Sequence, residues 1–237
     1  MEPYDKAITD KIVNSIIKEL NNPIRDSRLT MFLDVMKLDL KNGIPQIAGI
    51  QQTDEGASIV AYVKVKEAKF YLAFYFDPER DYEFIFCGPF PEVSIEYRIY
   101  TGAKYTKEEV LDMVKIKPGY MEKLEDFEDE TKDGKTVECW AIHFETYKGP
   151  GNISHKLDYL LDMFLRDETG FKKLFQKTRY KSIDMDVYFH VYNGEVDELY
   201  ITPEQANKLA RLGLGVHFKL CPEGKQITPV DLDFLSN

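Results

Sequence analysis

The sequence predicts an α+β protein. We expect a mixed sheet built from two strand–helix–strand (βαβ) units joined by a long helix, after an N-terminal region of helices and antiparallel strands. Apolar residues recur every three or four positions in some segments, as in amphipathic helices, and alternate in others, as in half-buried strands. The alternating segments are rich in β-branched and aromatic residues. An alternating strand followed by a helix that opens with threonine occurs twice, at Thr106 and at Thr202.

The N-terminal region, residues 1–92, is predicted to begin with two helices. The first covers residues 5–20, where isoleucine and leucine recur every four residues, and it ends before Pro23. The second covers residues 29–40 and ends before an Asn-Gly turn. Three segments rich in aromatic and β-branched residues are predicted strands: 59–67, 68–77 and 82–88.

The second domain, residues 93–221, contains the repeated strand–helix phrase, and residues 222–237 follow as a C-terminal tail. Thr106 and Glu109 have the spacing of a capping box, and so do Thr202 and Gln205. The predicted order is a strand (93–100), a helix from Thr106, a strand (136–147), a long helix capped by Ser154, a strand (182–192), a helix from Thr202 and a strand (216–220). Two copies of one supersecondary unit explain the recurrence, which therefore requires no chemistry.

Composition and charge narrow the class of partner. The net charge of −10 over 237 residues opposes nucleic-acid binding, which needs lysine and arginine to neutralise phosphates, and suits a basic partner. The three cysteines are an odd number without CxxC spacing, as expected of reduced thiols. The N-terminal residues lack the pattern of a signal peptide, and no apolar run approaches the ~18 residues of a membrane span. We therefore expect a cytoplasmic protein that binds no membrane and no cofactor.

Four segments together carry a resemblance to a known family. They are TKEEVLDMVKIKP, the strand WAIHFET with the lone Trp140, HKLDYLLDMF and ITPEQANKLARLGLGVHFKL. Over about residues 95–221 the chain resembles a bacterial domain family of unknown function, found in small cytoplasmic proteins of toxin-rich loci. The resemblance implies an immunity protein that neutralises a toxin, and it transfers no catalytic residue. The chain departs from the family in residues 120–134, where an acidic segment replaces a Lys-Gly turn.

Two groups of residues are candidate partner-binding sites. The first is the acidic segment with one aromatic residue, Glu122, Glu125, Asp126, Phe127, Glu128, Asp129 and Glu130. The second is the polar face of the strand 182–192, Asp184, Asp186, Tyr188, His190 and Tyr192. Acidic side chains could meet a basic surface, and tyrosine is enriched at interfaces. The alternative interpretations are a solvated acidic loop and a polar sheet face that is solvated or covered by the N-terminal half.

Three functional hypotheses follow. The first is a non-enzymatic binding protein, an immunity protein that occludes the active site of a cognate toxin domain; a basic nuclease is the toxin class that the charge suits. The second is a metal-assisted hydrolase that uses His143, His190 and His217, with Asp186 as a further candidate ligand. The third is a structural or regulatory adaptor. The first is favoured because the sequence contains no catalytic motif, and we therefore predict no catalytic residues and no metal.

Overall fold

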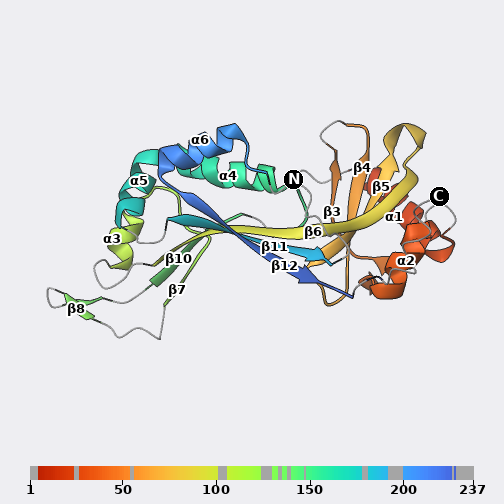
Figure 1. Ribbon diagram of the computed structural model, residues 1–237, viewed down its shortest axis with the longest axis horizontal. Helices are drawn as coiled ribbons and strands as arrows, with labels where there is room; N and C mark the ends of the chain where they lie inside the picture. Colours follow the sequence, from red (N-terminus) through yellow and green to blue (C-terminus); the bar gives the residue numbers. More distant parts are fainter. Residues whose placement is uncertain are drawn as a thin grey trace. The chain divides into compact units, whose positions relative to one another are not determined.

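The computed structural model describes residues 5–23, 27–53, 56–100, 106–123, 130–132, 135–137, 140–146, 148–177, 181–191, 200–225 and 227. The chain divides into two compact units. Unit 1 comprises residues 1–92, 188–197 and 220–237, and unit 2 comprises residues 93–187 and 198–219. Helices and a mostly antiparallel, curled sheet confirm the predicted α+β class (Figure 1).

Unit 1 begins with two helices, α1 (Lys6–Asn21) and α2 (Ser27–Val35), so the second predicted helix ends five residues early. A hairpin follows, β1 (Leu40–Lys41) and β2 (Ile44–Pro45), and its Asn42-Gly43 turn has positive φ at both residues. The remaining elements are β3 (Ile47–Gln52), β4 (Ile59–Lys64), β5 (Phe70–Asp77), the short 3₁₀ helix η1 (Pro78–Arg80) and the first part of β6 (Glu83–Tyr100). Neighbouring strands in the order β3-β4-β5-β6 pair antiparallel.

Both faces of β4 and β5 are buried. Ile59, Ala61 and Val63 belong to a core cluster that includes Ile12 of α1 and Phe32 of α2. The opposite face forms a second cluster, made of Val60, Tyr62, Tyr71 and Ala73. Because neither face is left to solvent, β5 carries a nearly continuous apolar run without clean alternation.

Unit 2 has a sheet in the order β7-β10-β6-β11-β12. Its strands are β7 (Tyr120–Lys123), β10 (Trp140–Glu145), the second part of β6, and the first parts of β11 (Ser182–His190) and β12 (Gly215–Glu223), whose last residues belong to unit 1. A separate two-stranded sheet pairs β8 (Glu130–Lys132) with β9 (Lys135–Val137). Its helices are α3 (Lys107–Leu111), α4 (Ile153–Arg166), α5 (Glu168–Lys177) and α6 (Pro203–Leu212).

The predicted caps are largely confirmed. Thr106 and Thr202 each form a capping box, with Glu109 and with Gln205. Helix α4 differs, because Asn152 caps it in place of Ser154, whose backbone N–H donates to the Asn152 side chain at 2.7 Å.

The first strand–helix–strand segment of unit 2 differs from the predicted βαβ unit. β6 and β10 are neighbours but run antiparallel, with Ala141 opposite Tyr100 and Glu145 opposite Glu96. A parallel connection must carry the chain back along the whole strand, usually with a long helix. Helix α3 has only five residues, and the chain forms β7 before it enters β10. Because the chain forms β7 between α3 and β10, it enters β10 in the direction opposite to that of β6.

Aromatic rings fix which side of this sheet the helices cover. Tyr97 of β6 packs edge-to-face on Phe164 of α4 at 5.8 Å and on Phe175 of α5 at 5.0 Å. Phe144 of β10 packs on Phe171 of α5 at 5.1 Å. Figure 1 shows α4, α5 and α6 along one side of these strands. The side chains that alternate with Tyr97 and Phe144 therefore point to the opposite side of the sheet.

An ion-pair network joins α6 to α4. The Lys208 ammonium lies 3.0 Å from Asp158, 2.8 Å from Asp162 and 3.3 Å from Glu204. These carboxylates, and first of all the hydrogen bond with Asp162, raise the pKa of Lys208 above its ordinary value.

None of the helices in the described ranges has the length and apolar character needed to cross a membrane.

Candidate binding face of unit 2

The side of the unit 2 sheet that faces away from α4 and α5 is polar. Ile95, Tyr97 and Ile99 of β6 are buried, and the residues between and after them are charged or aromatic. The same alternation holds along β11 as far as Val187, and β7 adds two residues to this side. In β10 the four central residues are all buried, and His143 and Glu145 point to this side. We call this side the polar face and define it by Glu96, Arg98, Tyr100, Tyr120, Glu122, His143, Glu145, Asp184 and Asp186.

His143 lies at the centre of the polar face and is completely buried, with 0% of its surface exposed. Its Nδ1 atom is 3.3 Å from Glu96 of β6, and its Nε2 atom is 3.2 Å from Glu122 of β7. The Tyr120 ring stacks on the imidazole with centroids 3.9 Å apart and an interplanar angle of 17°. The imidazole therefore bridges carboxylates on both neighbouring strands beneath an aromatic cover.

The guanidinium-bearing residue Arg98 lies opposite this histidine on the neighbouring strand β6. Arg98 donates to Glu96 at 2.9 Å and reaches the Tyr100 hydroxyl at 3.5 Å. The hydrogen bond with Tyr100, with the nearby charge of Glu96, raises the pKa of Arg98 above its ordinary value. Burial, reinforced by the charge of Glu96, raises the pKa of Tyr120. At neutral pH the face therefore presents a guanidinium paired with Glu96 and the neutral phenol ring of Tyr120.

The polar face combines negative charge with accessible aromatic rings. Five of the nine residues that define it are carboxylates and one, Arg98, is a guanidinium, and the ammonium of Lys148 lies 3.8 Å from the Glu145 carboxylate. Tyr100 and Tyr120 are 42% and 41% exposed. Tyrosine supplies a large contact area and a hydroxyl at small entropic cost, and carboxylates select a basic partner. This combination can hold a basic protein surface.

The predicted polar face of β11 is divided between the two units. Asp184 and Asp186 lie in unit 2 and are partly exposed, as expected from the alternation with buried Ile183 and Met185. The Asp184 carboxylate lies 3.4 Å from His217 of β12.

Tyr188 and His190 lie in unit 1. The Lys69 ammonium sits 4.3 Å from the centre of the Tyr188 ring. His190 is buried against Phe70, with ring centroids 5.1 Å apart, so it does not lie on the accessible face where the strand pattern had placed it. Gly224 permits this burial, because a Cβ atom there would lie 2.4 Å from the imidazole Cδ2.

The acidic segment is described only at its edges. Glu122 is in β7 and contacts His143. Glu130 is the first residue of β8, of which only the backbone is described at this position. The other predicted residues of this segment, Glu125, Asp126, Phe127, Glu128 and Asp129, lie outside the described residues, as does Tyr192 of the β11 group.

The histidines of unit 2 do not converge on one ion site. His143 is in β10 and His217 in β12, three strand positions away, which corresponds to about 14 Å across a sheet. Both nitrogens of His143 already face carboxylates. Among the described residues, no group of three or more His, Cys, Asp or Glu side chains could hold a metal ion.

The sequence did not reveal that two residues of the polar face lie in a strand. Tyr120 and Glu122 belong to β7, whose four residues were taken as part of the acidic segment. Their alternation with Met121 is a strand signal, but it is too short to stand out beside the acids that follow.

Comparisons with protein-family models, with curated proteins and with solved structures gave no match to this chain.

Proposed function

We propose that this chain is a non-enzymatic binding protein that holds a basic surface of another protein on the polar face of unit 2. The observation that carries the proposal is the pair Tyr100 and Tyr120, half-exposed rings on a helix-free, acidic sheet face. Buried His143 contacts carboxylates of both neighbouring strands beneath the Tyr120 ring, and these contacts support the register of the three strands. A binding surface gains affinity when its aromatic anchors are fixed before the partner arrives.

We further propose that the partner is a toxin domain and that the chain acts as an immunity protein. The resemblance of residues 95–221 to proteins of toxin-rich loci supports this role, and the net charge of −10 suits a basic nuclease. Such a protein would inhibit by occlusion, because an acidic surface competes with phosphates for the same basic side chains.

The hydrolase hypothesis fits this geometry less well. A general base needs a ring nitrogen within reach of substrate, and a metal ligand needs a free lone pair. Both nitrogens of His143 face glutamates, and the ring has no exposed surface. A substrate would have to displace Tyr120 or Glu122 before it could touch this imidazole.

The test is co-expression with the C-terminal domain of the protein encoded beside this one. The proposal predicts that the neighbouring domain stops growth alone and that this chain restores growth by forming a stable complex. Tyr100→Ala and Glu122→Lys should each raise the Kd at least tenfold, since loss of an interface anchor costs more than about 1.4 kcal/mol.

Tyr159→Ala is the matched control, because Tyr159 is an exposed tyrosine on helix α4, away from the polar face. It should leave the Kd unchanged. The polar face is excluded as the binding surface if Tyr159→Ala weakens the complex while the other two variants do not. A neighbour without toxicity and without a complex would refute the immunity role.

A further inference from the structure

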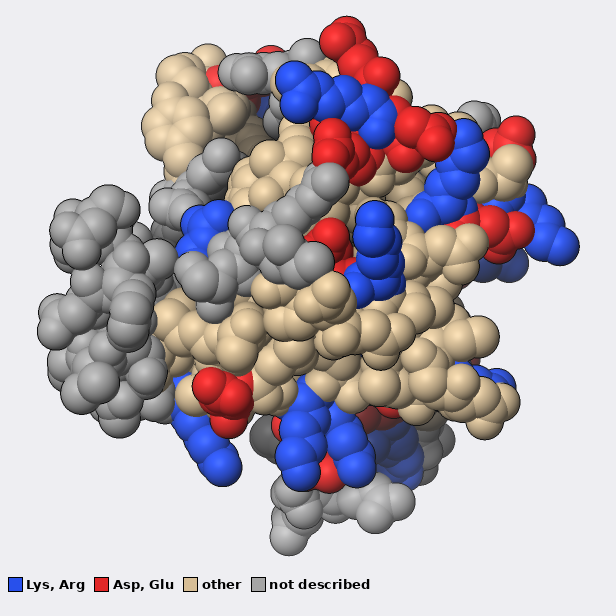
Figure 2. Space-filling view, turned by 90° about the vertical axis from the view of Figure 1, so that its right-hand side faces the viewer, with Lys and Arg blue, Asp and Glu red and all other residues tan. Residues whose placement is uncertain are grey.

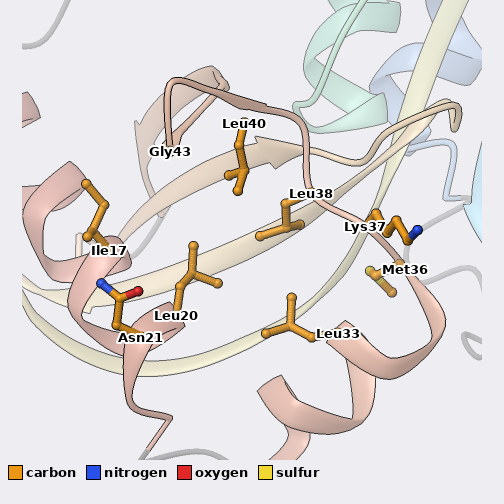
Figure 3. A pocket seen from close by; sticks show the side chains of 9 residues that line it. All are labelled: Ile17, Leu20, Asn21, Leu33, Met36, Lys37, Leu38, Leu40 and Gly43. Carbon is orange, nitrogen blue, oxygen red and sulfur yellow. The ribbon is translucent and has the colours of Figure 1, made fainter.

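Unit 1 contains an open cavity of about 490 Å³ between α1, α2 and the β1–β2 hairpin (Figure 3). Its walls are mainly aliphatic side chains from all three elements: Ile17, Leu20, Leu33, Met36, Leu38 and Leu40. Pockets that bind small molecules have volumes of about 300–1,000 Å³ and mostly apolar walls with a few polar groups. The size of this cavity therefore lies in the range of small-molecule sites, and its aliphatic side chains offer an apolar wall to a ligand chain.

The apolar surface continues from the cavity onto the hairpin. Leu40 is 49% exposed, and Ile44, which follows the Asn42-Gly43 turn, is exposed to a similar extent. Figure 2 looks onto the side where α1 and α2 lie in Figure 1, and shows uncharged residues, polar and apolar alike, between scattered lysine, arginine and acidic side chains. A ligand chain in the cavity would remove the side chain of Leu40 from water.

Two polar side chains border the cavity, Asn21 at the end of α1 and Lys37 just after α2. Within the described part of the chain, neither the Lys37 ammonium nor the Asn21 amide has a hydrogen-bond or ion-pair partner. Figure 3 shows the Lys37 nitrogen turned outward from the leucines, at the edge of the lined space. An unpaired cation at the edge of an aliphatic cavity complements a ligand with an apolar chain and an anionic head.

We propose that this cavity binds a free aliphatic carboxylate, with the chain among the leucines and the carboxylate at Lys37. The site belongs to unit 1 and does not depend on the function proposed for the polar face. The carboxylate would gain a charge-assisted hydrogen bond from the ammonium. Asn21 lies at the opposite end of the lined space in Figure 3 and is not part of the proposed carboxylate site.

The experiment is calorimetric titration of the full chain with hexanoate, octanoate and decanoate below their micellar concentrations. Each added methylene should tighten binding about fourfold, so each step of two methylenes should tighten it about fifteenfold. Decylamine should bind at least tenfold more weakly than decanoate, because its ammonium would face Lys37.

Two variants and a control locate the site. Leu40→Glu and Lys37→Glu change exposed side chains, so thermal unfolding should show an intact fold, and each should weaken decanoate binding at least tenfold. Lys6→Glu is the matched control, because Lys6 is an exposed lysine at the start of α1 that does not line the cavity. It should leave decanoate binding unchanged.

Three results would overturn the proposal. The first is absence of saturable decanoate binding at millimolar concentration. The second is equal binding of decylamine, which would remove the carboxylate from the argument. The third is a wild-type dimer that Leu40→Glu converts to monomer in light scattering while decanoate has no effect, because a second copy of the chain would then cover the cavity.

Discussion

Lys156 provides the sharpest test of how unit 2 is held together. This lysine of α4 is only 7% exposed, and its ammonium donates to the carbonyl oxygens of Val93 at 2.8 Å and of Gly149 at 2.5 Å. It thereby ties the start of the β6 segment of unit 2 to the loop before α4, where Gly149 and Gly151 have positive φ. Lys156→Met keeps the length of the side chain and removes both hydrogen bonds.

The expected loss can be worked from these contacts. A hydrogen bond from a charged donor contributes about 1.5–3 kcal/mol, so two of them contribute about 3–6 kcal/mol. Methionine avoids the free-energy cost of burying an ammonium, so the net loss of stability is smaller than this sum. We therefore expect a loss of about 3 kcal/mol, which lowers Tm by about 6–12 °C in a chain of this size.

The assay is urea unfolding followed by circular dichroism, with Lys173→Met on the exposed side of α5 as the matched control. The control should stay within about 0.5 kcal/mol of the wild type, as most surface substitutions do. If Lys156→Met were as stable as the control, or more stable than the wild type, the reasoning would be refuted. The ammonium would then cost as much to bury as its two hydrogen bonds return.

Three further predictions concern other parts of the fold. Gly170→Ala should cost about 2 kcal/mol, because a Cβ atom there would lie 2.5 Å from the backbone carbonyl oxygen of Met113 and 2.6 Å from the Asp167 carboxylate, and urea unfolding would show the loss. Lys208→Met should cost about 1 kcal/mol, because it leaves three neighbouring carboxylates without their cation, and the difference should shrink at high salt. Burial lowers the pKa of His190, opposed by a hydrogen bond with the Lys225 backbone. The unfolded chain therefore binds a proton more readily, and stability should fall as the pH drops below about 6.5, towards the lowered pKa.

Each of these has its own control. The pH dependence of unfolding between pH 7.5 and pH 5 should flatten in His190→Gln and persist in His217→Gln, since His217 is exposed. An unchanged slope in His190→Gln would contradict the burial argument. For Gly170→Ala, a gain in stability would mean that the helix preference for alanine outweighs the close contact. For Lys208→Met, a loss that is unaffected by salt would point to packing in place of charge.

Local signals in the sequence predicted the local structure. The capping-box spacing at Thr106 and Thr202 located the starts of two helices, since the cap residue and its partner are three positions apart. Alternation predicted which side chains are buried in β6 from Val93 to Ile99 and in β11 from Ile183 to Val187, but not at His190. Asn152 was missed as a cap because Ser154, two residues later, has an equally suitable hydroxyl.

Contacts between distant segments could not be predicted in this way. The neighbours of a strand depend on the path of the whole chain, so the antiparallel pairing of β6 with β10 has no local signature. His190 was expected on an exposed face, and its burial depends on Gly224, more than thirty residues later. The contact between His143 and Glu122 likewise required knowing that β7 lies beside β10. The candidate site is therefore a product of strand order, and only its residue types could be read from the sequence.

The two proposed sites should differ in how strongly binding depends on salt. Binding of a basic partner to the polar face depends on carboxylates at the surface, whose field falls off within about 10 Å at 0.1 M salt and more steeply above it. Its Kd should therefore rise between 50 and 300 mM NaCl. Binding of decanoate to the unit 1 cavity depends mainly on the burial of methylenes, which salt does not screen. Its dependence on chain length should stay the same over that range, with only the contribution of Lys37 reduced. If the Kd values of hexanoate, octanoate and decanoate became equal at high salt, charge would dominate the binding. The assignment of the aliphatic walls to the ligand chain would then be wrong.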